Sequence, residues 1–141
     1  MDASGYAAWA AAVTSAATLV VTTLVSGRRE QHRWARDALT DAFVAFLSAS
    51  WQHSDVARSG PPGDPAVAVG LAREYAEMRS HLTRLRLLTS ADVVAAGERL
   101  LRLQREVQDA ATPGDQHAAL EAASTARMTV VAAAKKAMGL P

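Results

Sequence analysis

The chain contains no cysteine, only two phenylalanines and almost no net charge. Without cysteine, disulfides, thiolate metal sites and a cysteine nucleophile are excluded together. The net charge of +1, from 15 basic and 14 acidic residues, gives no global field that would collect nucleic acid or acidic substrates. We therefore expect no nucleic-acid partner. With so little phenylalanine and abundant alanine, any core must be thin and built from closely approaching helices.

Charge is absent from a long N-terminal stretch, Ala3–Gly27. As a helix rising about 1.5 Å per residue, this stretch reaches roughly 37 Å, which exceeds the ~30 Å hydrocarbon core of a bilayer. Asp2 follows Met1 directly, so the basic start of a cleavable signal peptide is missing. We predict a transmembrane helix over residues 1–27, with the lipid bilayer as partner. The alternative is an alanine-rich helix buried in a soluble helical binding bundle.

Basic residues cluster directly after the charge-free stretch, at Arg28, Arg29, Arg33 and Arg36. Because basic residues near a span favour the cytoplasmic side, we expect the N-terminus outside and residues 28–141 in the cytoplasm. Amphipathic rings prefer the headgroup level of a membrane. The expected membrane-interface residues are therefore Tyr6, Trp9, Arg28, Arg29, Arg33, Trp34 and Arg36. Trp34 has a second interpretation, as a residue packed in the helical domain.

Small and hydroxyl residues recur every three or four positions along one face of the charge-free helix. In lipid, such residues let backbones approach closely and let hydroxyls bond across helices. We interpret this stripe as a helix-contact face for self-association or for docking on a membrane protein; it consists of Ala7, Ala11, Thr14, Ser15, Thr18 and Thr22. The alternative is that the hydroxyls bond only to carbonyls of their own helix.

No strand signal appears in the rest of the chain, where apolar residues repeat at helical spacing. The repeats predict helices over about 28–58, 65–88, 91–111 and 115–138. Asp64 followed by Pro65 is a strong helix start, Thr89 to Asp92 is typical of a capping box, and Gly139 is a natural stop. Short connections between helices with one apolar stripe each favour an antiparallel four-helix bundle. The predicted class is all-α, with the transmembrane helix continuing into this bundle.

The first of these helices has a second apolar line, formed by Phe43, Leu47 and Trp51. Extrapolated along a straight helix, the line falls below the threonine stripe of the predicted span. It therefore extends the helix-contact face into the cytoplasm. The alternative is that all three residues belong to one wide arc buried inside the bundle.

No pattern in the sequence indicates catalysis, a cofactor or a metal. HExxH, phosphate-binding glycine loops and GxSxG are absent, and no Glu stands three residues before a histidine, as in bundle metal sites. Glu77 and His81, four residues apart, are more typical of an exposed ion pair than of a metal site. The arginines of the second and third of these helices, Arg79 to Arg105, are interleaved with Glu74, Glu77, Glu98, Glu106 and Asp109, which indicates a mixed solvated face and not a phosphate-binding surface.

The uncharged span, the junction from Gly27 to Asp37 and the Arg- and Ala-rich helical domain resemble uncharacterised single-pass membrane proteins of high-GC actinobacteria. The resemblance implies location and architecture, and no functional residue is transferred. The sequence favours a membrane-anchored helical scaffold or accessory subunit, without enzymatic activity, that acts by helix association. One alternative is a homo-oligomeric pore lined by Thr14, Thr18 and Thr22.

Overall fold

The structure, a computed structural model, describes the backbone of residues 3–141 and the side chains of residues 26–141. It is all-α, with helices α1 (Ala3–Arg58), α2 (Pro65–Leu88), α3 (Ala91–Asp109) and α4 (Pro113–Ala137). No strand occurs between residues 3 and 141. The chain forms two compact units, residues 1–37 and residues 38–141.

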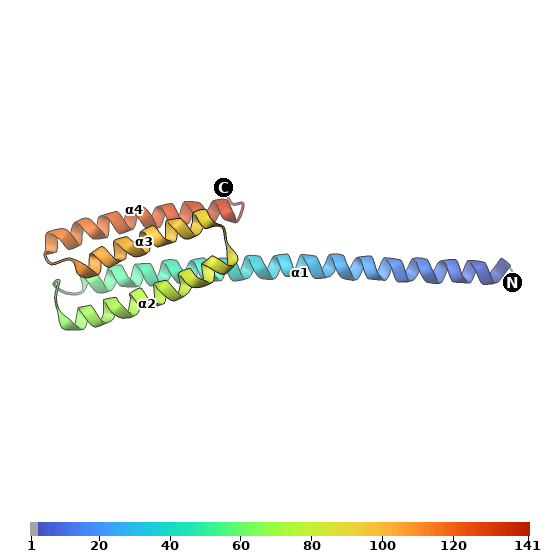
Figure 1. The fold of residues 1–141 in the computed structure, drawn as a ribbon, viewed down its shortest axis with the longest axis horizontal. Helices are drawn as coiled ribbons and strands as arrows, with labels where there is room; N and C mark the ends of the chain where they lie inside the picture. The colour runs from blue at the N-terminus through green and yellow to red at the C-terminus, as the bar shows by residue number, and fades with distance from the viewer. Residues whose placement is uncertain (1–2) are drawn as a thin grey trace. The chain divides into compact units, whose positions relative to one another are not determined.

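The unit of residues 38–141 is an antiparallel helical bundle, in which α2, α3 and α4 lie beside the C-terminal part of α1 (Figure 1). Thr40 near the start of this unit contacts Met138, whereas Ala57 at the other end of α1 contacts Gln116 of α4. The two helices therefore run in opposite directions. Arg86 pairs with Glu98, and Arg105 lies over Tyr75, so α2 and α3 are antiparallel as well.

Polar residues at the helix ends explain where α2 and α4 begin. The Asp64 side chain accepts hydrogen bonds from the backbone N–H groups of Ala66 and Val67, and Pro65 occupies the first helical position, as predicted. Thr112 and Pro113 repeat this arrangement, with the Thr112 hydroxyl accepting from the Asp115 N–H. α4 therefore begins two residues before the predicted position 115, and α3 ends at Asp109 instead of 111.

The predicted capping box between α2 and α3 is wrong. Thr89 is the C-cap of α2, and Ser90 is the N-cap of α3 without a side-chain hydrogen bond to the helix. Thr89 therefore ends α2 and Ser90 begins α3, so Thr89 does not cap an amide of α3. The predicted stop at Gly139 is confirmed: its φ is 67°, and the N–H groups of Gly139 and Leu140 donate to the Lys136 and Lys135 carbonyls.

Two apolar clusters form the core of the bundle, each with contributions from all four helices. The larger cluster centres on Phe46, Met78, Leu100 and Val130, and the smaller one contains Ala57, Leu71, Val107 and Leu120. Gly97 of α3 lies close to other helices, since a Cβ there would be 2.6 Å from Leu82 Cδ1. The predicted thin core with closely approaching helices therefore describes this unit.

No helix among the described residues contains an apolar window long enough to cross a bilayer. The side chains of the predicted span, residues 3–25, lie outside the described residues.

Candidate functional site: a buried polar layer and an exposed apolar face

A layer of polar side chains separates the two apolar clusters. Each of these side chains is at most 2% exposed, and they come from three helices: Ser50, His53 and Ser54 from α1, Gln104 from α3 and Arg127 from α4. Buried polar groups destabilise a fold unless they are hydrogen-bonded, so the partners of each one matter.

Arg127 is the hub of this layer. Its Nε donates to Ser50 Oγ at 2.9 Å, and its NH2 donates to Ser54 Oγ at 2.8 Å. The guanidinium carbon lies 3.9 Å from the centre of the Trp51 ring, a close cation–π contact. No carboxylate of the described residues lies within 4 Å of Arg127. Burial lowers the pKa of the Arg127 guanidinium, and Arg58 lowers it further while Asp55 raises it.

Gln104 joins α3 to the same serines. Its Nε2 donates to Ser50 Oγ at 2.8 Å and to the Ser50 carbonyl at 3.1 Å. Its Oε1 is buried without a hydrogen-bond partner. Ser50 therefore accepts from two helices at once, which fixes the positions of α3 and α4 against α1 at this level.

His53 is the least satisfied member of the layer. Neither ring nitrogen has a hydrogen-bond partner of acceptable geometry, and the ring centre lies 6.4 Å from that of Tyr75. Burial lowers the pKa of the His53 imidazole to about 4; Gln104 and Glu74 act to raise it, and Arg127 lowers it. His53 is therefore a neutral core histidine at pH 7.

This polar layer is not among the features predicted above, although the sequence contains a signal for it. Gln104 falls between Leu100 and Val107 on the apolar stripe of α3, and Arg127 falls between Ala123 and Val130 on that of α4. A polar residue at a core position of several helices indicates a shared polar layer. Only the structure shows that these positions meet at one level.

An exposed apolar surface lies where α1 and α4 meet, outside the polar layer. Val44 is 59% exposed, Trp51 50% and Met128 64%. Leu47 and Val131, at helical spacing from these residues, are partly buried. We name this surface the α1–α4 face; it consists of Val44, Leu47, Trp51, Met128 and Val131.

The structure places the three bundle residues of the predicted helix-contact face in different environments. Phe43 is buried in the larger core cluster, so its side chain stabilises the bundle itself. Leu47 is partly buried at the edge of that cluster, and Trp51 is exposed. The membrane part of that predicted face, together with the pore lining proposed for the same helix, lies outside the described residues: Ala7, Ala11, Thr14, Ser15, Thr18 and Thr22.

The predicted membrane-interface residues that the structure describes are all exposed on α1. Trp34 is 71% exposed, and Arg28, Arg29, Arg33 and Arg36 are exposed around it. Trp34 lines an open hollow along one side of the helix with Gly27, Glu30 and Gln31. Tyr6 and Trp9 lie outside the described residues.

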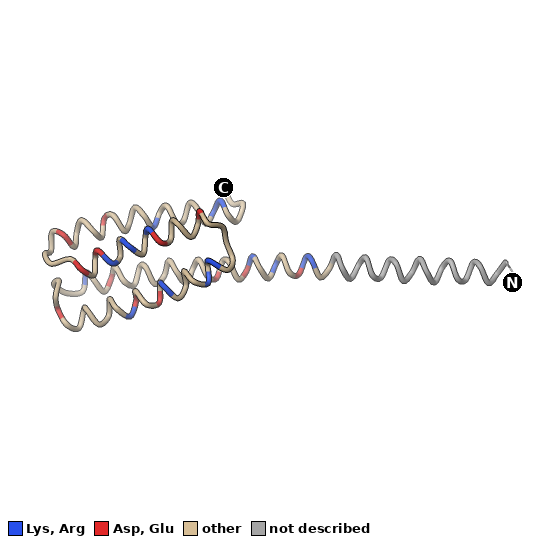
Figure 2. The backbone as a smooth tube through the Cα atoms, in the orientation of Figure 1, with Lys and Arg blue, Asp and Glu red and all other residues tan. Residues whose placement is uncertain are grey.

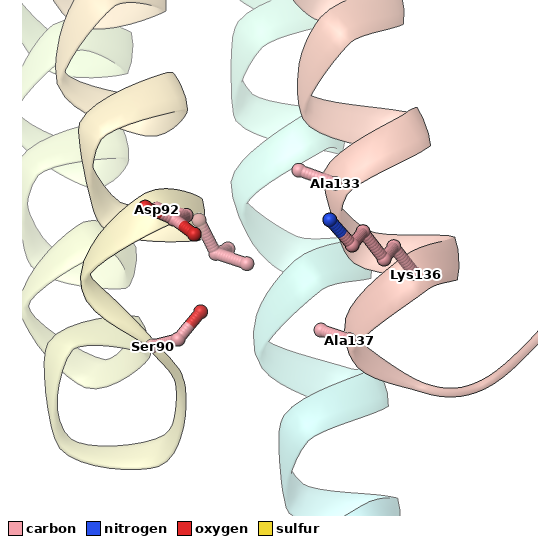
Figure 3. A pocket seen from close by; sticks show the side chains of 6 residues that line it. Ser90, Asp92, Ala133, Lys136 and Ala137 are labelled. Atoms are coloured by element: carbon pink, nitrogen blue, oxygen red, sulfur yellow. The ribbon is translucent and has the colours of Figure 1, made fainter.

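One shallow cavity of about 330 Å³ lies between the start of α3 and the end of α4. Figure 3 shows Ser90 and Asp92 on one side, facing Ala133, Lys136 and Ala137 on the other. The carboxylate and the ammonium offset one another here, so the cavity presents no net charge to a ligand.

Groups of three or more potential metal ligands do not occur among the described residues. His81 Nε2 lies 3.7 Å from Glu77 Oε2 at the surface, as an ion pair when the imidazole is protonated. Arginines are interspersed with Asp and Glu along α2 and α3 (Figure 2), which agrees with the predicted mixed face. Comparison with family models, curated proteins and solved structures gave no match for this chain.

Proposed function

We propose that this chain is a single-pass, membrane-anchored helical scaffold or accessory subunit that acts by helix–helix association and assembles with itself. The observation that carries the proposal is the junction on α1. Trp34 stands 71% exposed among four exposed arginines, immediately after 25 residues without charge. An exposed indole beside guanidinium groups suits the headgroup region of a bilayer.

The same arginines support an orientation. Arg28, Arg29, Arg33 and Arg36 all lie within nine residues after the charge-free stretch. The bundle of residues 38–141 then lies in the cytoplasm, and the N-terminus lies outside. Each cation near an anionic leaflet contributes about 1 kcal/mol to membrane association, which adds to the apolar contribution.

Self-association has two sources of support. The small and hydroxyl stripe of the charge-free helix suits close packing of helices in lipid. In the bundle, the α1–α4 face leaves three large apolar side chains exposed on one surface. No cofactor or catalytic residue enters this proposal.

The anchor is tested by carbonate extraction of membranes from cells that express the full chain. The variant Val20→Arg places a charge near the middle of the stretch, at a cost of about 2.5–3.5 kcal/mol to insertion. We expect wild type and the matched control Val20→Leu to remain in the membrane pellet, and Val20→Arg to shift toward the supernatant. If all three chains appear in the supernatant, the proposed anchor is wrong.

A further inference from the structure

The basic residues that follow the charge-free stretch lie on one side of α1. Residues 28–37 are helical and exposed throughout. At about 100° per residue, an arc of about 140° contains all the basic side chains of this segment. We name this surface the arginine face; it consists of Arg28, Arg29, His32, Arg33 and Arg36. The carboxylates of the same segment, Glu30 and Asp37, lie about 110 to 130° from its centre. Acidic and basic residues are therefore interleaved along the sequence but separated around the helix.

The arginine face has no compensating carboxylates among the described residues. Arg29 and Arg33 are four residues apart, a spacing at which like charges destabilise a helix. Glu30 and Asp37 stand three and four residues from Arg33, the spacings at which an ion pair can form. Nevertheless, no carboxylate in the described part of the chain lies within 4 Å of the Arg28, Arg29 or Arg33 guanidinium. An anion from outside the chain would therefore stabilise this arrangement.

The depth of the arginine face matches the headgroup layer of a bilayer. Side chains of an α-helix lean toward its N-terminus, so these arginines lean toward the charge-free stretch. The headgroup layer is roughly 5 to 7 Å thick on each side of the hydrocarbon core. With Gly27 at the edge of the core, Arg28 and Arg29 begin at this level, and Arg33 begins about 9 Å from Gly27 along the axis. The long apolar stem of Arg33 extends back along the helix and brings its guanidinium to the same layer.

The opposite side of the helix has a different chemistry. Trp34 lines an open hollow there with Gly27, Glu30 and Gln31. This side contains a carboxylate and no basic residue, so it repels an anion. Guanidinium groups, in contrast, bind phosphate oxygens through paired N–H donors. A phosphate-bearing ligand is therefore favoured on one side of α1 only.

We propose that the arginine face binds the headgroup of an anionic phospholipid, of which phosphatidylglycerol is a simple example, in the cytoplasmic leaflet. This inference deepens the proposed membrane anchor and rests on it. A nucleic acid also offers phosphates, but the adjoining charge-free stretch brings lipid headgroups to the level of these arginines. In phosphatidylcholine the ammonium group offsets the phosphate, so the anionic lipid is preferred.

Native mass spectrometry of the full chain in a neutral detergent tests this preference, because it resolves chains with one bound lipid from chains with none. The two probes are phosphatidylglycerol and phosphatidylcholine with the same acyl chains. Since one cation near an anionic leaflet contributes about fivefold to binding, we expect wild type to bind phosphatidylglycerol at least about fivefold more tightly than phosphatidylcholine. Equal affinity for the two lipids would overturn the proposal. Displacement of phosphatidylglycerol by an equal concentration of inorganic phosphate or of a DNA duplex would assign the face to a soluble anion and overturn it as well.

A charge exchange tests the arrangement around the helix at constant composition. Arg29→Glu combined with Glu30→Arg puts a carboxylate near the centre of the arginine face and moves one arginine off it, without changing the net charge. We expect the dissociation constant for phosphatidylglycerol to rise at least about fivefold and that for phosphatidylcholine to stay unchanged. The matched control, His32→Arg combined with Arg33→His, exchanges two residues inside the face and should bind as wild type does. Equal weakening in both double variants, or no weakening in the first, contradicts a one-sided site.

Two further measurements separate this inference from a folding effect and from the proposed function. All four exchanged positions are exposed, so circular dichroism should give the same helix content for both double variants and wild type. A chain that stays in the membrane pellet after carbonate extraction but binds both lipids equally keeps its anchor and loses this site. A chain that is extracted into the supernatant but still prefers phosphatidylglycerol keeps the arginine face as a lipid-binding surface and loses its anchor.

Discussion

At the scale of single residues, the bundle is shaped by polar side chains inside its core. Arg127 is buried without a carboxylate and relies on two serine hydroxyls and the face of Trp51. His53 beside it is buried with neither ring nitrogen bonded. A proton on His53 would put a second cation into this layer, where only Glu74 of the neighbouring helices is a nearby anion. The layer therefore tolerates neutral His53 and opposes its charged form.

The pH dependence of stability follows from this environment. Because the pKa of His53 falls from 6.5 in the unfolded chain to about 4 in the folded one, the unfolded chain binds the extra proton between these values. Above pH 6.5 both states are neutral and the group has no effect. As the pH falls from 6.5 to 4, stability decreases by about 1.4 kcal/mol per pH unit, or about 3 kcal/mol in all.

Urea unfolding followed by circular dichroism at pH 7, 5.5 and 4.5 measures this loss. His53→Leu should have a flatter pH dependence than wild type, because the proton that the unfolded chain takes up at His53 is then absent. His117→Leu, at an exposed histidine of α4, serves as the control and should follow wild type. Parallel pH dependences for wild type and His53→Leu would contradict the assignment.

At the scale of the helices, the sequence predicts most of the elements, because helix ends are governed by local chemistry. Asp64 and Pro65 act within one turn, so the start of α2 is readable without knowledge of the fold. The sequence does not predict the α2–α3 connection correctly, because Thr89 and Ser90 both suit a helix cap. Only the packing of the two helices decides which of them is used. Phe43 and Trp51 show the same limit: they share an apolar line, yet one is buried and the other exposed. Which of the two side chains is buried depends on where α4 packs against α1.

The two caps provide a matched comparison of helix starts. Asp64→Ala removes a side chain that accepts from two backbone N–H groups, and should lower the free energy of unfolding by about 1 kcal/mol. Ser90→Ala removes a hydroxyl that makes no cap hydrogen bond and should cost only about 0.3 kcal/mol. Chemical denaturation of both variants at pH 7 measures the difference. Equal losses would show that the Ser90 hydroxyl caps α3 in solution.

At the scale of the whole molecule, the sequence predicts the helices of the bundle but only part of the candidate site. The junction of Trp34 and its arginines follows from residues adjacent in sequence. The α1–α4 face and the polar layer depend on residues of α1 and α4 that are far apart in the sequence, such as Ser50 and Arg127, which are 77 positions apart. Periodicity on a single helix contains no information about which face meets which.

Labelling of single introduced cysteines tests the orientation of the whole chain, because the chain contains no cysteine of its own. Ser4→Cys lies before the charge-free stretch, and Ser59→Cys lies in the exposed connection after α1. With a membrane-impermeant maleimide on intact cells, we expect labelling of Ser4→Cys alone, because the proposed orientation places the bundle in the cytoplasm. Ser59→Cys should react only after the cells are permeabilised. Labelling of Ser59→Cys in intact cells would reverse the proposed topology.

The polar layer also constrains how α4 can shift along α1. A slide of α4 along α1 by one turn, about 5.4 Å, would carry the Arg127 guanidinium away from one serine and place it against Phe46 or Ala57. Both are apolar, so a displacement of α4 along the axis of α1 would leave the buried Arg127 cation beside apolar side chains. A small tilt between the helices keeps both serine contacts. The polar layer therefore opposes sliding of α4 along α1 more strongly than it opposes a small tilt between the two helices.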